Sequence, residues 1–202
     1  AEAIGDEDRR RRVAQELRTL TVKKRRRGIP IEDFVMGLAA NFLVGGDSLT
    51  DLQVLREETV TRELCYGLEV PAPTTAGERL RTFSLGHIYQ LERIHRRMGG
   101  SILSRVGGAG PLTVDVDSSI LEVHGYLKEG ARYGYSGVRG LHPLLAFAYE
   151  ERVLLGARLR TGNRASADGV VPFLTQVLKA IPEPRRARLR MDAGFYARDV
   201  EQ

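Results

Sequence analysis

A short apolar segment near the middle of the chain runs Leu112-Thr113-Val114-Asp115-Val116-Asp117-Ser118-Ser119. It predicts a strand over residues 112–116 that ends in aspartates and serines. Asp115 and Asp117 are two residues apart, so on a strand they point to the same face. Two negative charges on a largely apolar strand are costly unless a positive group neutralises them, and hard cations such as Mg²⁺ prefer carboxylate oxygens. An aspartate at a strand end is also a common turn former, and this alternative stays open for each residue taken alone.

A second segment ends in a similar way. Residues 186–191 alternate basic and apolar side chains and predict a strand, which runs into Asp192-Ala193-Gly194-Phe195-Tyr196. If the two strands are neighbours, Asp117 and Asp192 could share one or two metal ions. Two metals about 4 Å apart can activate a water or hydroxyl nucleophile and stabilise the leaving oxygen in phosphodiester cleavage. Asp115, Asp117 and Asp192 are therefore candidate metal ligands.

The elements between these two strands have a definite order. Two apolar runs, residues 141–149 and 153–159, are separated by the polar residues 150–152 and predict a hairpin. Residues 168–181 predict an amphipathic helix that prolines end. The resulting order, β-β-β-α-β, is the opening of a ribonuclease-H-like fold, although other α/β domains share it.

The first half of the chain predicts short helices. Residues 31–44 have a broad apolar face that ends at Gly45-Gly46, and glycines are frequent between residues 99 and 110. Several short helices with tight turns are compatible with a helix-turn-helix DNA reader, and equally with a plain helical packing module. We therefore expect a basic arm (1–28), a helical and possibly DNA-binding domain (29–100), a Gly-rich linker (101–110) and the first part of a catalytic domain (111–202).

Positive charge is concentrated at the start of the chain. The net charge is +5, and the first 28 residues alone hold ten Lys/Arg against five Asp/Glu. Basic clusters attract a phosphate backbone, whereas a solvated arm is the alternative. Arg188 and Arg190 on the second strand could also contact phosphates, unless they only face solvent. The candidate nucleic-acid-binding residues are Arg10, Arg11, Lys24, Arg25, Arg26, Arg188 and Arg190.

Composition excludes several other classes of protein. With 42% hydrophobic and 28% charged residues, the chain resembles an ordinary globular protein rather than a disordered one. It has no apolar stretch near the roughly 20 residues needed to cross a bilayer, and no apolar signal core. Cys65 is the single cysteine, so we expect a reducing compartment, the cytoplasm. Because the chain begins at Ala1 and stops at Gln202, shortly after a new helix is predicted to begin, we expect it to be a fragment.

Several ordered motifs from Gly37 onward resemble the DDE transposases of bacterial insertion sequences, particularly the insertion-sequence-1380-type group. The first motif of that family is an Asp followed by Ser/Thr and Thr at a strand end, similar to residues 114–119. The second is an Arg-x-Asp-small-Gly-Phe string, similar to residues 190–196. Segments similar to the family pattern also occur at 41–46, 52–57, 129–131, 134–135, 140–147 and 159–163.

The resemblance implies a ribonuclease-H-like core and Mg²⁺-dependent chemistry on DNA, with Mn²⁺ as a substitute ion. Asp117 matches the first catalytic aspartate and Asp192 the second, while Asp115 is a competing candidate or a supporting carboxylate. The implied partners are double-stranded DNA, as transposon ends and target, and a second copy of the chain during the reaction. The family's third catalytic residue is a Glu on a helix well downstream of the second Asp, and Glu201 is too close to Asp192 to be that residue.

Two alternatives to an active transposase stay open. A catalytically inactive remnant that only binds DNA or an intact transposase is favoured by the missing Glu. An unrelated hydrolase with paired carboxylates, for instance one acting on sugars, is disfavoured because the chain has no Trp and only 6% aromatic residues. His142 is predicted to be a hydrogen-bonded structural histidine, with a place near the site as the alternative.

Overall fold

The protein is described from a computed structural model that covers residues 2–22, 28–57, 67–106, 108, 110–125, 127–182 and 186–196. The chain divides into two compact units, Ala1–Ile94 and His95–Gln202, and each is treated by itself. Within the described ranges, no helix has the length and apolar character that a membrane span requires. Three of the candidate phosphate-binding residues, Lys24, Arg25 and Arg26, lie outside the described residues.

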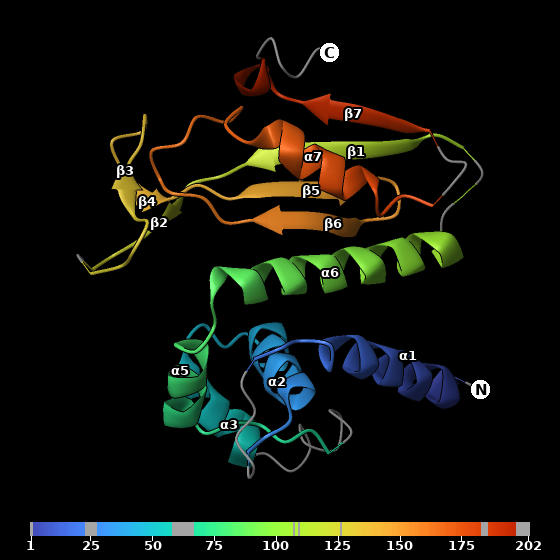
Figure 1. The fold of residues 1–202 in the computed structure, drawn as a ribbon, viewed down its shortest axis with the longest axis vertical. Helices are drawn as coiled ribbons and strands as arrows, with labels where there is room; N and C mark the ends of the chain where they lie inside the picture. The colour runs from blue at the N-terminus through green and yellow to red at the C-terminus, as the bar shows by residue number, and fades with distance from the viewer. Residues whose placement is uncertain are drawn as a thin grey trace. The chain divides into compact units, whose positions relative to one another are not determined.

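The elements described in the first unit are helices (Figure 1). They are α1 (Glu2–Leu17), α2 (Ile31–Leu43), the 3-10 helix η1 (Leu49–Asp51), α3 (Leu52–Glu57), α5 (Pro73–Leu80) and the first part of α6 (Leu85–Val106). Their apolar faces meet in a core that includes Phe34 and Leu52, both fully buried. The described elements of this unit are helical, while a separate helical domain with a role in DNA binding stays a prediction.

Helix α6 extends further than the glycine content predicts. It continues through Gly99 and Gly100 to Val106, so residues 101–106, expected to begin a linker, are helical. A Cβ on Gly99 would lie 3.4 Å from the Leu154 carbonyl oxygen, and one on Gly100 would lie 2.6 Å from that of Ala180. The glycine pair therefore allows close approach to other backbone segments and does not interrupt the helix.

The second unit is built on a mixed four-stranded sheet. Its strands are β1 (Leu112–Ser118), β5 (Leu144–Ala148), β6 (Val153–Arg158) and β7 (Ala187–Met191), in the order β6-β5-β1-β7. β1 is antiparallel to β5 and parallel to β7, and β5 and β6 form the predicted hairpin. Helix α7 (Val170–Leu178) connects β6 to β7 across one face of the sheet (Figure 1). The α/β class and the order strand-strand-strand-helix-strand are confirmed for this sheet.

Alternation along β1 determines which face of the sheet is buried. Leu112, Val114 and Val116 are buried, and they share a core with four residues of α7: Val170, Phe173, Leu174 and Val177. The intervening side chains of β1, including both aspartates, point to the opposite face. The apolar face therefore anchors the strand while the aspartates stay accessible.

A second, smaller sheet was not predicted. It consists of β2 (Leu121–Glu122), β3 (Arg132–Tyr133) and β4 (Arg139–Leu141), in the order β2-β4-β3. Figure 1 shows it beyond the end of β1 at which the arrowhead lies. Strands of two or three residues are too short to show a period-two pattern, so periodicity does not indicate them.

Candidate functional site at the ends of two parallel strands

The register of β1 against β7 brings Asp117 and Asp192 to neighbouring positions. The parallel pairing matches Asp115 with Arg190 and ends at Val116 with Met191; Asp117 is the next residue of β1, and Asp192 directly follows β7. Adjacent strands lie about 4.8 Å apart, and side chains at paired parallel positions point to the same face. The Asp115–Arg190 ion pair identifies that shared face. The two strands are thus neighbours, which is the condition that a shared metal site requires.

Each of the two aspartates is held by the backbone that follows it. The Ser118 N–H donates to Asp117 Oδ1 at 2.7 Å, and the Gly194 N–H donates to Asp192 Oδ1 at 2.9 Å. The second contact caps the 3-10 helix η2 (Ala193–Phe195). Both carboxylates are exposed, and neither Oδ2 atom has a hydrogen-bond partner among the described residues. Each group therefore presents one oxygen to solvent in a fixed orientation.

Asp115 has a different environment from Asp117. Its oxygens accept hydrogen bonds from Arg190 Nε at 2.6 Å and from the Arg190 terminal nitrogen at 2.5 Å. The Arg190 guanidinium also lies 4.2 Å from the centre of the Tyr149 ring, and the hydrogen bonds to Asp115 raise the Arg190 pKa. The charge of Asp115 is therefore neutralised inside the protein, and a metal ion is not needed for that purpose.

The other candidate phosphate contacts lie in different places. Arg10 and Arg11 are on α1, where Arg11 forms an i,i+4 ion pair with Glu7 at 2.8 Å. Arg188 is exposed on β7, whereas Arg190 is occupied by Asp115. Of the two arginines predicted on this strand, Arg188 is the one available to a phosphate in this structure.

A buried histidine lies beside the aspartate-bearing strand end. His142 is only 1% exposed, which agrees with the prediction of a structural histidine. Its Nδ1 donates to the Arg164 carbonyl oxygen at 2.7 Å, because a carbonyl can only accept, and its Nε2 lies 3.1 Å from Ser118 Oγ. The hydroxyls of Ser118 and Ser166 are in turn 3.1 Å apart. His142 therefore also meets the alternative prediction, a place near the site.

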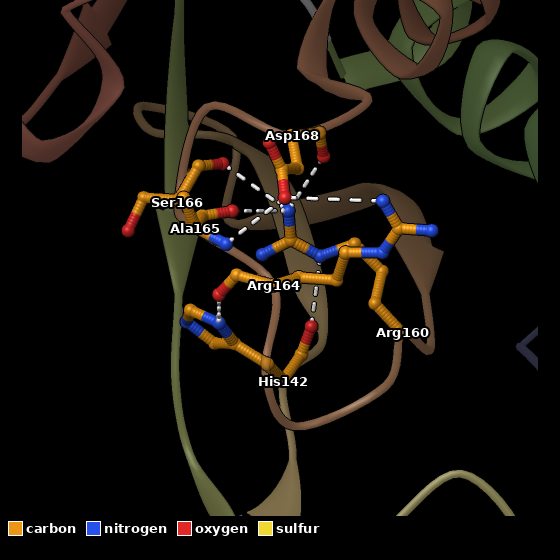
Figure 2. Close-up of polar contacts among 6 residues, drawn as sticks. All are labelled: His142, Arg160, Arg164, Ala165, Ser166 and Asp168. Atoms are coloured by element: carbon orange, nitrogen blue, oxygen red, sulfur yellow. Dashed lines mark hydrogen bonds and ion pairs between the residues drawn. The ribbon is translucent and has the colours of Figure 1, made fainter. Parts of the chain in front are cut away.

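Arg160 organises the loop that contributes Ser166. Its Nε donates to the His142 carbonyl oxygen at 2.9 Å, and one terminal nitrogen donates to the carbonyl oxygens of Ala165, Ser166 and Asp168 at 3.0, 3.2 and 2.7 Å. Figure 2 shows these contacts together with the Asp168 carboxylate, which accepts from the Ala165 N–H at 3.1 Å. Burial lowers the pKa of Arg160, although the nearby Asp168 opposes this shift. The carbonyl oxygens of this loop thus accept hydrogen bonds from the Arg160 guanidinium.

The donor set at the strand ends fits a divalent cation. Asp117 and Asp192 are exposed carboxylates at the adjacent ends of β1 and β7, each with one oxygen that has no hydrogen-bond partner among the described residues, and oxygen ligands are what Mg²⁺ and Mn²⁺ prefer. No group of three or more His, Cys, Asp or Glu side chains suited to a metal ion occurs in the part of the chain that the structure describes. The described residues therefore provide an open pair of ligands, not a closed cage.

Fold and site together define a mixed α/β protein with a carboxylate pair suited to a divalent metal at the ends of parallel strands. The profile of the family described as Transposase DDE domain group 1 matches residues 4–202. The chain belongs to this family of transposases. Transposases act on DNA, and their DDE domains generally use divalent metal ions. None of the curated proteins matches the chain.

Sequence reasoning missed Ser166 and Arg160 and treated Ser118 only as part of a motif. Ser118 and Ser166 are 48 residues apart, and no local pattern connects them. The one available signal was the alternation of Arg and small residues after the hairpin, which did not indicate a compact loop. The contacts of this loop depend on tertiary structure.

Proposed function

We propose that the protein is a transposase of the insertion-sequence-1380-type group whose ribonuclease-H-like domain cleaves DNA strands and transfers them at insertion-sequence ends. The observation that supports this most strongly is the parallel pairing of β1 with β7, because Asp117 and Asp192 follow the last pair on these two neighbouring strands. The sheet order β6-β5-β1-β7, with α7 between β6 and the parallel strand β7, supports the ribonuclease-H-like part of this proposal.

In this proposal Asp117 and Asp192 hold Mg²⁺ or Mn²⁺, and Asp115 is a supporting residue that positions β7 through Arg190. A bound divalent ion supplies charge stabilisation at the scissile phosphate and lowers the pKa of water. Water attacks the phosphorus at the element's end, the bond to the 3′ oxygen breaks, and a 3′-hydroxyl and a 5′-phosphate result. The 3′-hydroxyl then attacks a target phosphorus and displaces the target's own 3′ oxygen.

Backbone groups of the chain orient the two carboxylates. The backbone N–H groups of Ser118 and Gly194 each fix one oxygen of a carboxylate, which leaves the other oxygen directed outward. An exposed pair of ligands at a sheet edge suits a substrate as large as duplex DNA. The exposed Arg188 on β7 is assigned to the phosphate backbone, as are the basic residues of the amino-terminal segment. A second copy of the chain pairs the two DNA ends, and the reaction takes place in the cytoplasm.

The proposal is tested by comparing Asp117→Asn and Asp192→Asn with Asp8→Asn, an exposed aspartate on α1. Labelled duplexes that carry the element's terminal repeats are incubated with each protein and Mg²⁺ or Mn²⁺. Losing a ligand is expected to cost more than the 10–100-fold typical of an outer-shell partner, so cleavage should fall by more than about 100-fold with DNA binding retained. Asp8→Asn should cleave like the wild type, and undiminished cleavage by either site variant would contradict the assignment.

The inactive alternative predicts a different result for the wild type. A remnant that binds DNA or an intact transposase would shift the labelled duplexes without cleaving them in either metal. Adding this protein to an active relative would then lower the rate at which the relative cleaves DNA.

A further inference from the structure

The loop that contains Ser166 lies between the two segments that carry the aspartates. On one side, Ser166 Oγ is 3.1 Å from the hydroxyl of Ser118, the residue whose N–H holds Asp117. On the other side, a Cβ on Gly194 would lie 3.3 Å from Ser166 Oγ and 3.1 Å from Asp192 Oδ1. Gly194 is the residue whose N–H holds Asp192. Ser166 is therefore packed against both residues that orient the carboxylates.

His142 fixes the other end of this arrangement. Its ring is buried, and both nitrogens have partners: the Arg164 carbonyl oxygen and the Ser118 hydroxyl. Whichever way the hydroxyl protons point, Ser118 Oγ has a partner on each side, His142 and Ser166. Arg160 holds the same loop through the carbonyl oxygens of Ser166 and Asp168. The loop is thus fixed to the buried histidine and cannot move freely away from the strand ends.

Resting on the proposed function, we infer that Ser166 and His142 are positioning residues that set the spacing of Asp117 and Asp192. Beyond Met191 the β1–β7 pairing stops, so Asp192 is not held by the sheet itself. Ser166 packs against the turn at Gly194 and forms a hydrogen bond to Ser118. It therefore connects the end of β1 to the residues that follow β7. Outer-shell partners of this kind orient metal ligands, and their loss typically costs 10–100-fold in metal affinity.

The test measures Mn²⁺ affinity of the full chain by electron paramagnetic resonance, where bound Mn²⁺ loses the signal of the free ion. Ser166→Ala, His142→Asn and Gly194→Ala are compared with the wild type. The matched control is Ser104→Ala in α6, which removes a hydroxyl bonded to the Gly100 carbonyl oxygen at 2.9 Å, away from the site. Thermal unfolding of each protein is recorded in the same buffer.

We expect Ser166→Ala to weaken Mn²⁺ binding by about 10-fold with its unfolding temperature close to that of Ser104→Ala. Gly194→Ala, which crowds the same gap from the other side, should also bind Mn²⁺ more weakly than the wild type. If His142→Asn does not fold, Ser166→Ala and Gly194→Ala still decide the matter. Wild-type affinity in both would overturn the inference.

The same titration separates this inference from the proposed function. If Asp117→Asn and Asp192→Asn bind Mn²⁺ as well as the wild type, the metal site itself is wrong. If both lose affinity and Ser166→Ala does not, the metal site stands and the positioning role of Ser166 is wrong.

Discussion

Asp115 and Asp117 lie two positions apart on one face of β1, and their partners give them different roles. Asp115 lies level with Arg190 and forms a two-point ion pair with it, whereas Asp117 lies one step past the last β1–β7 pair. A carboxylate that already has a guanidinium partner gains little from a cation, while an exposed one beside a second aspartate gains more. We therefore propose that Asp115 has a structural role and that Asp117, one step past the end of the β1–β7 pairing, has the functional one.

The Asp115–Arg190 pair is expected to stabilise the edge strand β7. Arg190→Gln leaves the partly buried Asp115 without its counter-ion, so the unfolding temperature should fall. Asp115→Asn should also lower it, and the double variant should lose less than the sum of the two single changes. Arg188→Gln, an exposed position of the same strand, is the control and should have little effect. Strictly additive losses in a thermal denaturation series would show that the two residues are not coupled.

The candidate site was only partly predictable at this scale. Asp117 and Asp192 stood out because each follows an apolar strand and is flanked by small residues. The partner of Asp115 could not be predicted, because it depends on strand register, which no local pattern fixes. Ser166 was missed for the same reason, since its contacts come from Ser118 and Gly194, far away in sequence.

Among the elements, α6 shows how glycines can support a helix through packing. Gly100 faces the Ala180 carbonyl oxygen, which a Cβ would approach to 2.6 Å, whereas Gly86 in the same helix has only the Ser84 hydroxyl near, at 3.7 Å. Helix propensity favours alanine at both positions, by up to about 1 kcal/mol. A difference in stability between alanine substitutions at the two positions would therefore come from packing.

Gly100→Ala is accordingly expected to lower the free energy of unfolding, by about 1–3 kcal/mol, because backbone must shift to admit the methyl group. Gly86→Ala should leave it unchanged or raise it by up to about 1 kcal/mol. Urea denaturation of both variants measures the difference. Equal effects of the two substitutions would mean that Gly100 does not pack as described.

His95, on α6, makes the stability of the folded protein depend on pH. Burial lowers the pKa of His95, and the adjacent Arg96 lowers it further. The unfolded chain therefore takes up the proton first as the pH falls below about 6.5, and the folded state loses stability until its own lower pKa is reached. His95→Gln removes this titration, so the stability of the variant relative to the wild type should rise as the pH is lowered from 7.5 to 5. Urea denaturation at both pH values checks this, and a constant difference would contradict it.

At the element scale, long periodic segments were predictable and short ones were not. The alternation in residues 112–116 and the apolar stripe of residues 168–181 predicted β1 and α7, because their buried faces repeat over several residues. β2, β3 and β4 have two or three residues each, and their pairing depends on neighbouring strands. The linker prediction was wrong for residues 101–106 because glycine permits close packing as well as flexibility.

For the whole molecule, the uneven charge has a measurable consequence. If the amino-terminal cluster binds phosphates, neutralising one of its phosphate-binding side chains should reduce the slope of log K against log salt by about 0.9 for duplex DNA. Replacing Lys24, Arg25 and Arg26 with Gln should therefore reduce the slope by up to about 2.7. Arg11→Gln should change it less, because Arg11 already pairs with Glu7. Fluorescence anisotropy at several salt concentrations measures the slopes, and identical slopes would show that this segment does not bind DNA.

We propose that Asp117 and Asp192 together hold one divalent metal ion. Iron-directed hydroxyl-radical cleavage tests it most directly, because Fe²⁺ bound in place of Mg²⁺ cuts the polypeptide only near the ion. We expect cuts near residues 117 and 192 and in the loop around Ser166, suppressed by excess Mg²⁺ and absent in both Asp117→Asn and Asp192→Asn. Cuts near only one of the two strand ends, or cuts that persist when either aspartate is replaced, would contradict it.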